Sequence, residues 1–160
     1  MKNTENALKW IVNILESKKV RFQITGGFAA GLYGSNRELA DIDIDINDDD
    51  FEKITNEVKQ YIIFGPEQFK DENWDLKLMT LEYEGQVIDI CGESTIFDKN
   101  NNKWMLIKTD FSNSNHVNTY GIDIPVITKE SLVAYKSKLL RNVDVEDIEA
   151  LNNFGSNFVQ

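Results

Sequence analysis

Aspartate and isoleucine residues alternate at the start of an acidic segment. Residues 40–46 read ADIDIDI, and three further aspartates follow at positions 48–50. Successive side chains of a β-strand point to opposite faces, so Asp41, Asp43 and Asp45 would share one face. Carboxylates two residues apart on a strand are separated by roughly 6–7 Å, and neighbouring ones can converge on one hard cation. The pattern therefore predicts an oxygen-only site for magnesium, manganese or calcium.

Two other interpretations of this segment stay open at this point. One is a solvated polar strand face that binds nothing. The other is a calcium-binding loop of the D-x-D-x-[DN]-G-x5-E type, but Ile46 stands where that loop requires glycine for its sharp turn. Asp48, Asp49 and Asp50 are expected to form the acidic first turn of the following helix, where the helix dipole favours negative charge.

A glycine pair precedes the aspartates by a short interval. Gly26-Gly27 follows the apolar–polar alternation of residues 20–25, and Asp41 comes 14 residues after Gly27. Residues without side chains at the end of a strand and the start of a helix let a phosphate approach the backbone. A phosphate-binding turn next to an Asp-x-Asp strand predicts a site for a metal–nucleoside triphosphate complex.

A third carboxylate lies further along the chain, in the stretch QVIDIC. Val87, Asp89 and Cys91 would share one strand face, opposite Ile88 and Ile90. A charged group between apolar β-branched residues is costly to bury unless it faces a site. Asp89 is therefore a candidate metal ligand or a base for an attacking hydroxyl. The alternative is a solvated aspartate on an edge strand.

The apolar pattern predicts the elements that would position these groups. Helices are expected over residues 4–18 (with Thr4 as N-cap), 28–33, 49–60, 129–140 and 144–152. Strands are expected over residues 20–25, 40–46 and 122–127, with a hairpin over residues 75–91 that turns at Glu84-Gly85. Residues 96–121 are expected to be mainly loop, with one short strand at WMLIK. The prediction is an α+β fold, a mixed β-sheet flanked by helices with a helical C-terminal end. It forms one domain over residues 1–160, with a core at about 20–127 and C-terminal helices at about 128–152.

Composition limits the classes of partner. The chain has 160 residues and a net charge of −10, which argues against a long nucleic-acid partner. One cysteine and one histidine exclude an internal disulfide and a cysteine/histidine zinc site within one chain. No apolar run approaches the ~20 residues of a membrane span, and the N-terminus lacks a signal-peptide core, so we expect a cytoplasmic protein.

The three motifs together resemble the nucleotidyltransferase superfamily with the DNA polymerase β-type fold. The matching stretches are ITGG (24–27), DID (41–43) and VIDI (87–90). The string GGFAAGLYGSNRELADIDIDI is similar to the small antibiotic nucleotidyltransferases of the lincosamide and aminoglycoside kind, including the pair Arg37-Glu38. The C-terminal helical region resembles that of abortive-infection nucleotidyltransferases, in which a lysine, an arginine and two spaced aspartates recur. Here these are Lys136, Arg141, Asp144 and Asp147.

The resemblance implies roles for individual residues. Asp41, Asp43 and Asp89 would hold one or two magnesium (or manganese) ions. Asp45 would lie just outside these metal ligands or would be solvated. The residues implied in nucleotide binding are Thr25, Gly26, Gly27, Ser35, Arg37 and Lys136. For Arg37 an ion pair with the aspartates is the slightly favoured alternative, and for Lys136 a solvated helix position is equally open. Trp74, Trp104 and Tyr120 could stack on a base or pack in the core.

The implied activity is transfer of a nucleoside monophosphate from a nucleoside triphosphate to a hydroxyl of a small-molecule acceptor, with release of pyrophosphate. ATP is the expected donor, and a homodimer could complete the acceptor pocket. Leu39 and Cys91 replace residues that many relatives carry near the motifs, which leaves the acceptor open. The alternative is a toxin–antitoxin or phage-defence protein that keeps the fold and acts on a protein or RNA, or binds nucleotide without turnover.

Overall fold

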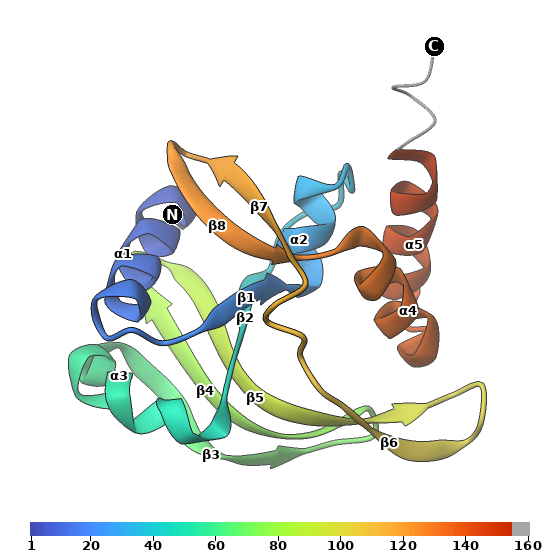
Figure 1. The fold of residues 1–160 in the computed structure, drawn as a ribbon, viewed down its shortest axis with the longest axis horizontal. Coiled ribbons are helices and arrows are strands. Elements are labelled where there is room, and N and C mark those ends of the chain that lie inside the picture. Colours follow the sequence, from blue (N-terminus) through green and yellow to red (C-terminus); the bar gives the residue numbers. More distant parts are fainter. Residues whose placement is uncertain (155–160) are drawn as a thin grey trace.

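A curved mixed sheet with helices packed on it organises the chain (Figure 1). The computed structural model describes residues 1–154. The strands are β1 (Phe22–Thr25), β2 (Asp41–Ile46), β3 (Ile62–Lys70), β4 (Trp74–Tyr83), β5 (Gln86–Asp98), β6 (Lys103–Ile107), β7 (Ser114–Thr119) and β8 (Ile122–Ile127). The α-helices are α1 (Thr4–Ser17), α2 (Gly26–Leu32), α3 (Phe51–Val58), α4 (Lys129–Leu139) and α5 (Asn142–Phe154). The predicted α+β class is confirmed, and the hairpin turns at the predicted Glu84-Gly85.

The strand order places the predicted motifs side by side. The sheet runs β3-β4-β5-β2-β1-β8-β7, and β6 pairs with the distal part of β5. Strand β2 is antiparallel to β1 and parallel to β5, which puts Asp43 opposite both Thr25 and Asp89. Three segments far apart in the sequence therefore meet at the centre of the sheet.

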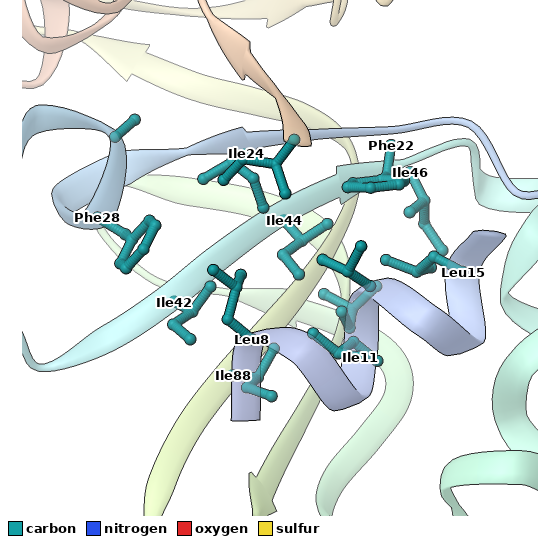
Figure 2. Close-up of a cluster of buried hydrophobic side chains, with 14 of the residues drawn as sticks. Leu8, Ile11, Leu15, Phe22, Ile24, Phe28, Ile42, Ile44, Ile46 and Ile88 are labelled. Carbon is teal, nitrogen blue, oxygen red and sulfur yellow. The ribbon is translucent and has the colours of Figure 1, made fainter. Parts of the chain in front are cut away.

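The alternation in β2 divides its side chains between the core and the opposite face. Ile42, Ile44 and Ile46 are at most 2% exposed, whereas the three aspartates that alternate with them are partly exposed. Figure 2 shows the isoleucines facing the apolar side of α1. Helix α1 buries Leu8, Ile11, Leu15 and their neighbours against this face. Burying one such side chain contributes about 1.5–3 kcal/mol, so the core fixes which face of β2 carries the carboxylates.

Local details of three predicted elements differ from the expectation or sharpen it. The N-cap of α1 is Asn3, whose side chain accepts a hydrogen bond from the Asn6 amide at 3.0 Å, and Thr4 is already inside the helix. Asp48–Asp50 form a 3₁₀ turn that leads into α3, as expected for an acidic helix start. Helix α2 begins earlier than expected, at Gly26 itself.

The sequence pattern missed two strands. Strand β7 lies in a stretch expected to be loop, and it pairs antiparallel with β8 from Ser114 to Thr119. It is the last strand of the sheet, where ladder hydrogen bonds need no apolar side chains and polar residues protect an exposed edge. Strand β3, for which no element was expected, pairs antiparallel with β4. The short strand expected at WMLIK is β6. Within the described residues, no helix is both long and apolar enough to cross a bilayer.

Candidate active site

Three carboxylates converge where β2 and β5 pair. Asp43 lies directly opposite Asp89, and Asp41 is one pleat away on the same face of β2. One oxygen of each of Asp41, Asp43 and Asp89 lies within 4.8 Å of the others. We call these residues the site triad. The predicted convergence is confirmed, and because β5 is flanked by β4 and β2, the edge-strand alternative for Asp89 is wrong.

The site triad is short of positive charge. Burial raises the pKa of Asp43 well above its usual value, and the neighbouring carboxylates, Asp41 foremost, raise it further. Burial also raises the pKa of Asp89 to about 6, against the lowering effect of the hydroxyl of Thr80, which donates to Asp89 at 2.6 Å. Clustered oxygen ligands that repel one another are the donor set that a divalent hard cation such as magnesium stabilises. The residues present therefore fit a bound Mg²⁺ or Mn²⁺.

The glycine pair makes room for the side chains of the site itself. Gly26 has a φ of +65°, and a Cβ there would overlap the carboxylate of Asp43. A Cβ on Gly27 would lie 2.6 Å from Nη2 of Arg37. Thr25 ends β1 and lines the same cavity, and its side chain makes no capping hydrogen bond to α2. The glycines are thus required for the close approach of Asp43 and Arg37, a reason that the sequence alone did not supply.

A second carboxylate cluster lies on α5 and is fully compensated. Asp144 and Asp147, the helix pair, are both 0% exposed. Lys136 Nζ lies 3.2 Å from Asp144 Oδ1 and 3.0 Å from Asp147 Oδ2, and Arg141 Nε lies 2.7 Å from Asp144 Oδ2. Lys136 is only 1% exposed, so the solvated alternative for this lysine is wrong.

Arg37 and Ser35 also bind the helix pair. Arg37 donates from Nε and Nη2 to Asp147 at 2.8 and 2.9 Å, and Ser35 Oγ donates to the same carboxylate at 2.7 Å. Arg37 is thus in an ion pair, but its partner is Asp147. The slightly favoured alternative had placed this ion pair on the strand aspartates. Ser35 is buried and does not line the cavity, so the structure does not bring its hydroxyl to the phosphate site.

These ion pairs reverse the usual effect of burial on the carboxyl groups. Burial raises the pKa of Asp144, but the guanidinium of Arg141 and the ammonium of Lys136 outweigh it and hold the pKa below its usual value. For Asp147 the hydrogen bonds from Arg37 and Ser35 outweigh burial in the same way. The helix pair is therefore ionised, and it ties α5 to α4 and to the segment after α2.

One cavity of about 540 Å³ joins the site triad, the glycine pair and the C-terminal helices. Its size is typical of a small-molecule site. Of the three candidate stacking residues, only Trp74 lines it; Trp104 and Tyr120 are exposed elsewhere. Trp74 Nε1 donates to the hydroxyl of Tyr135 at 2.7 Å, and the guanidinium of Arg141 lies 4.6 Å from the Trp74 ring centroid.

Sequence reasoning missed a segment that crosses over the site. Thr109, between β6 and β7, donates from its hydroxyl to Asp45 at 2.8 Å, and Gln23 donates to the carbonyl of Asp110 at 3.0 Å. Burial raises the pKa of Asp45 to about 7, against the hydrogen bond from Thr109. Asp45 is thus a partner of this crossing segment and is not among the three carboxylates whose oxygens converge. No pattern in residues 92–121 marked Thr109, because a lone threonine in a polar loop carries no spacing signal.

Several solved structures share the fold. A protein from Thermotoga maritima described as a nucleotidyltransferase superposes with a TM-score of 0.73 at 23% identity, over 98% of this chain and 96% of that one. The lincosamide antibiotic adenylyltransferase LnuA, bound to lincomycin, superposes with a TM-score of 0.62 at 22% identity, over 96% and 99%. ANT(2")-Ia in complex with adenylyl-2"-tobramycin gives 0.59 at 13% identity, over 96% and 88%. The likeness establishes the nucleotidyltransferase fold.

Sequence comparison gives the family. A search of curated proteins finds no match. Residues 7–151 match the model of the aminoglycoside-2''-adenylyltransferase family, a span that includes the site triad, the glycine pair and the helix pair. Because that match covers most of the chain, the protein belongs to the aminoglycoside-2''-adenylyltransferase family and is a nucleotidyltransferase.

Proposed function

We propose that the protein transfers the nucleoside monophosphate of ATP to a hydroxyl of a small-molecule acceptor in a reaction that depends on Mg²⁺ or Mn²⁺. One observation carries the proposal: three uncompensated carboxylates converge within 4.8 Å in a cavity that the glycine pair also lines. The adenylyltransferase name of the family and of LnuA, together with the adenylyl-2"-tobramycin bound by ANT(2")-Ia, supports ATP as donor. Their antibiotic substrates support a small hydroxylated acceptor.

The residues of the chain divide the chemistry between them. Asp41, Asp43 and Asp89 would hold the divalent ion. When bound, that ion would supply positive charge against the negative charge that builds up on the phosphates. Thr25 and the glycine pair line the cavity beside the triad and would position the triphosphate there, with the guanidinium of Arg37 held against Gly27.

The transfer step balances with groups at hand. An oxygen–phosphorus bond forms between the acceptor hydroxyl and the α-phosphorus, and the bond from that phosphorus to the bridging oxygen breaks. Pyrophosphate leaves with the electron pair. Asp89 would accept the hydroxyl proton, and the hydroxyl of Thr80 holds its carboxylate in place through one oxygen. Lys136 and Arg37 would keep positive charge at the cavity wall while paired with the helix pair.

A labelling experiment tests the proposal. The protein is incubated with α-labelled ATP, GTP, CTP or UTP, with Mg²⁺, and with a panel of hydroxylated small molecules. We expect labelled product from ATP, and we expect it only when Mg²⁺ is present. Nucleotide binding is measured separately by calorimetry with a non-hydrolysable ATP analogue. If neither Mg²⁺-dependent binding nor transfer occurs in the folded protein, the proposed function is wrong.

A further inference from the structure

A row of cross-strand partners forms one wall of the cavity. Phe69 on β3 pairs with Leu76 on β4, Leu76 pairs with Ser94 on β5, and Ser94 pairs with Ile107 on β6. Directly paired residues point to the same face of a sheet, and all four line the cavity. The one hydroxyl in the row, that of Ser94, donates to the carbonyl of Gly92 at 3.3 Å. We call the apolar members of this surface the apolar wall: Phe69, Trp74, Leu76, Leu78 and Ile107.

A β-bulge in β5 puts this wall on the same face as the site triad. Leu78 pairs with Cys91 and Leu76 pairs with Ser94, so two steps on β4 correspond to three on β5. Without the extra residue, Ser94 would point to the opposite face from Asp89, because side chains alternate with a period of two. The bulge therefore extends the face of Asp89 into the apolar wall.

An aspartate from the acidic segment holds the bulge. Asp48 Oδ1 accepts a hydrogen bond from the Glu93 amide at 2.8 Å, and a Cβ on Gly92 would overlap that same oxygen. The bulge is thus anchored by a side chain that begins the turn before α3. A bulge with its own anchor is a built feature of the site.

The apolar wall and the phosphate site lie on opposite sides of the triad. In the strand order β3-β4-β5-β2-β1, Gly26 follows β1, whereas Leu76 and Leu78 belong to β4. In-line displacement requires the attacking hydroxyl to approach the phosphorus from the side opposite the leaving group. With pyrophosphate held at Gly26 and Gly27, the acceptor approaches from the side of the apolar wall.

We infer that the acceptor, given the transfer proposed above, is a hydroxylated small molecule that lays an extended apolar face on the apolar wall. Thr80 is paired with Asp89, so Leu78 and Leu76 lie roughly 7 and 13 Å along β4 from the reacting end. An acceptor with its hydroxyl at Asp89 therefore presents apolar groups at roughly 7–13 Å from that hydroxyl.

A graded set of ligands tests the chemical class without requiring turnover. The probes are β-glucosides with methyl to hexyl aglycones, which keep the hydroxyls constant while the apolar length grows, and a tri-amino sugar on the same ring. Binding is followed by calorimetry in the presence of Mg²⁺ and a non-hydrolysable ATP analogue. We expect Kd to fall by up to about fourfold for each added CH₂ that lies on the wall, and the tri-amino sugar to bind no better than the methyl glucoside.

Neighbouring residues on β6 supply a matched pair of variants. Ile107 lines the cavity, whereas Leu106 is 50% exposed on the opposite face of the same strand. Ile107→Ser and Phe69→Ser should flatten the dependence of Kd on chain length, and Leu106→Ser should leave it steep. Binding of the ATP analogue should be the same in all three variants, which also shows that they are folded.

The two failures are distinguishable. A flat series in the unaltered protein, a steep series in Ile107→Ser, or preferred binding of the tri-amino sugar, each with intact Mg²⁺–nucleotide binding, overturns the acceptor class alone. Absence of Mg²⁺–nucleotide binding overturns the proposed transfer, and with it the assignment of any ligand of the wall as an acceptor.

Discussion

Two clusters of aspartates lie at the same cavity: the site triad lines it, and the helix pair lies beside it. They differ in whether cationic side chains neutralise their negative charge. The site triad on β2 and β5 lies within 4.8 Å with no ion pair to any of its members in the described part of the chain. The helix pair on α5 is more deeply buried, yet three cations contact it: Lys136, Arg37 and Arg141. Burial alone therefore does not distinguish a binding site from a structural network.

The neighbours of each cluster explain the contrast. Neither β2 nor β5 contains a lysine or arginine, and the neighbours of the triad on its face are Asp45, Val87 and Cys91, so no cation comes from the same strands. In α4 and α5 the helical spacing and the short connection bring Lys136 and Arg141 to the carboxylates. A buried carboxylate with a raised pKa is poised for an external cation, whereas one with a lowered pKa already has its partner.

The largest expected effect comes from the triad. Asp43→Asn should lower metal-dependent transfer by about a thousandfold, because it removes one ligand for the ion that offsets charge on the phosphates. The same change should not lower the stability of the metal-free protein at pH 8, since it removes repulsion. Transfer rates and thermal unfolding check both parts. Asp49→Asn, an exposed aspartate of the same segment, is the control and should match the unaltered protein.

The helix pair should respond in the reverse manner. Asp147→Asn removes the carboxylate that pairs with Arg37 and one of the two that pair with Lys136, and we expect a loss of about 3 kcal/mol in the free energy of unfolding. Urea denaturation measures it, with Glu146→Gln on the exposed side of the same helix as control. A loss no larger than that of the control would show that the network is not structural and would break the comparison.

The pH dependence of stability should separate the two clusters without mutation. The pKa of Asp45 is about 7 and that of Asp89 about 6, above roughly 3.9 in an unfolded chain. Protonation of these groups favours folding, so their contribution is complete below about pH 4 and is lost as the pH rises through 6–7. Between about pH 8 and pH 5 the metal-free protein should therefore gain roughly 5 °C in Tm.

The helix pair limits that gain on the acid side. Its lowered pKa values contribute stability that is present above about pH 4 and is lost on further acidification. Added Mg²⁺ should remove the gain by stabilising the ionised triad at pH 8. Differential scanning calorimetry at several pH values, with and without Mg²⁺, measures both effects, and a metal-free Tm that rises with pH across this window would contradict the assignment of raised pKa values.

The smallest effect concerns the crossing segment. Thr109→Val removes the hydrogen bond to Asp45 and should lower the free energy of unfolding at pH 8 by about 1 kcal/mol. It should also raise the pKa of Asp45 further, which carboxyl-carbon NMR can follow. Thr119→Val, at the end of the edge strand β7, is the control. An unchanged pKa would show that burial alone sets the charge state of Asp45.

The fold class, the hairpin and the convergence of the triad could be predicted from the sequence, because they depend on the strand period and on burial of the core. Asp41, Asp43 and Asp89 alternate with isoleucines that must enter the core, so their shared face followed from the sequence. The partners of Ser35, Arg37 and Lys136 did not follow. All three bind Asp147, which is about 110 residues away from Ser35 and Arg37 in the chain, and no spacing rule connects such positions.

The sequence by itself determined that a strand with one apolar and one acidic face lies near a glycine turn, because local periodicity and the hydrophobic effect suffice for that. Only the tertiary structure decided which carboxylates lack counter-charge, since that depends on which cations the C-terminal helices bring and where they are already paired. It also decided where the apolar wall lies. One extra residue in β5, held by Asp48, determines which face of the sheet each side chain beyond Cys91 points to. A period-two sequence pattern cannot reveal this bulge, because the bulge interrupts the alternation itself.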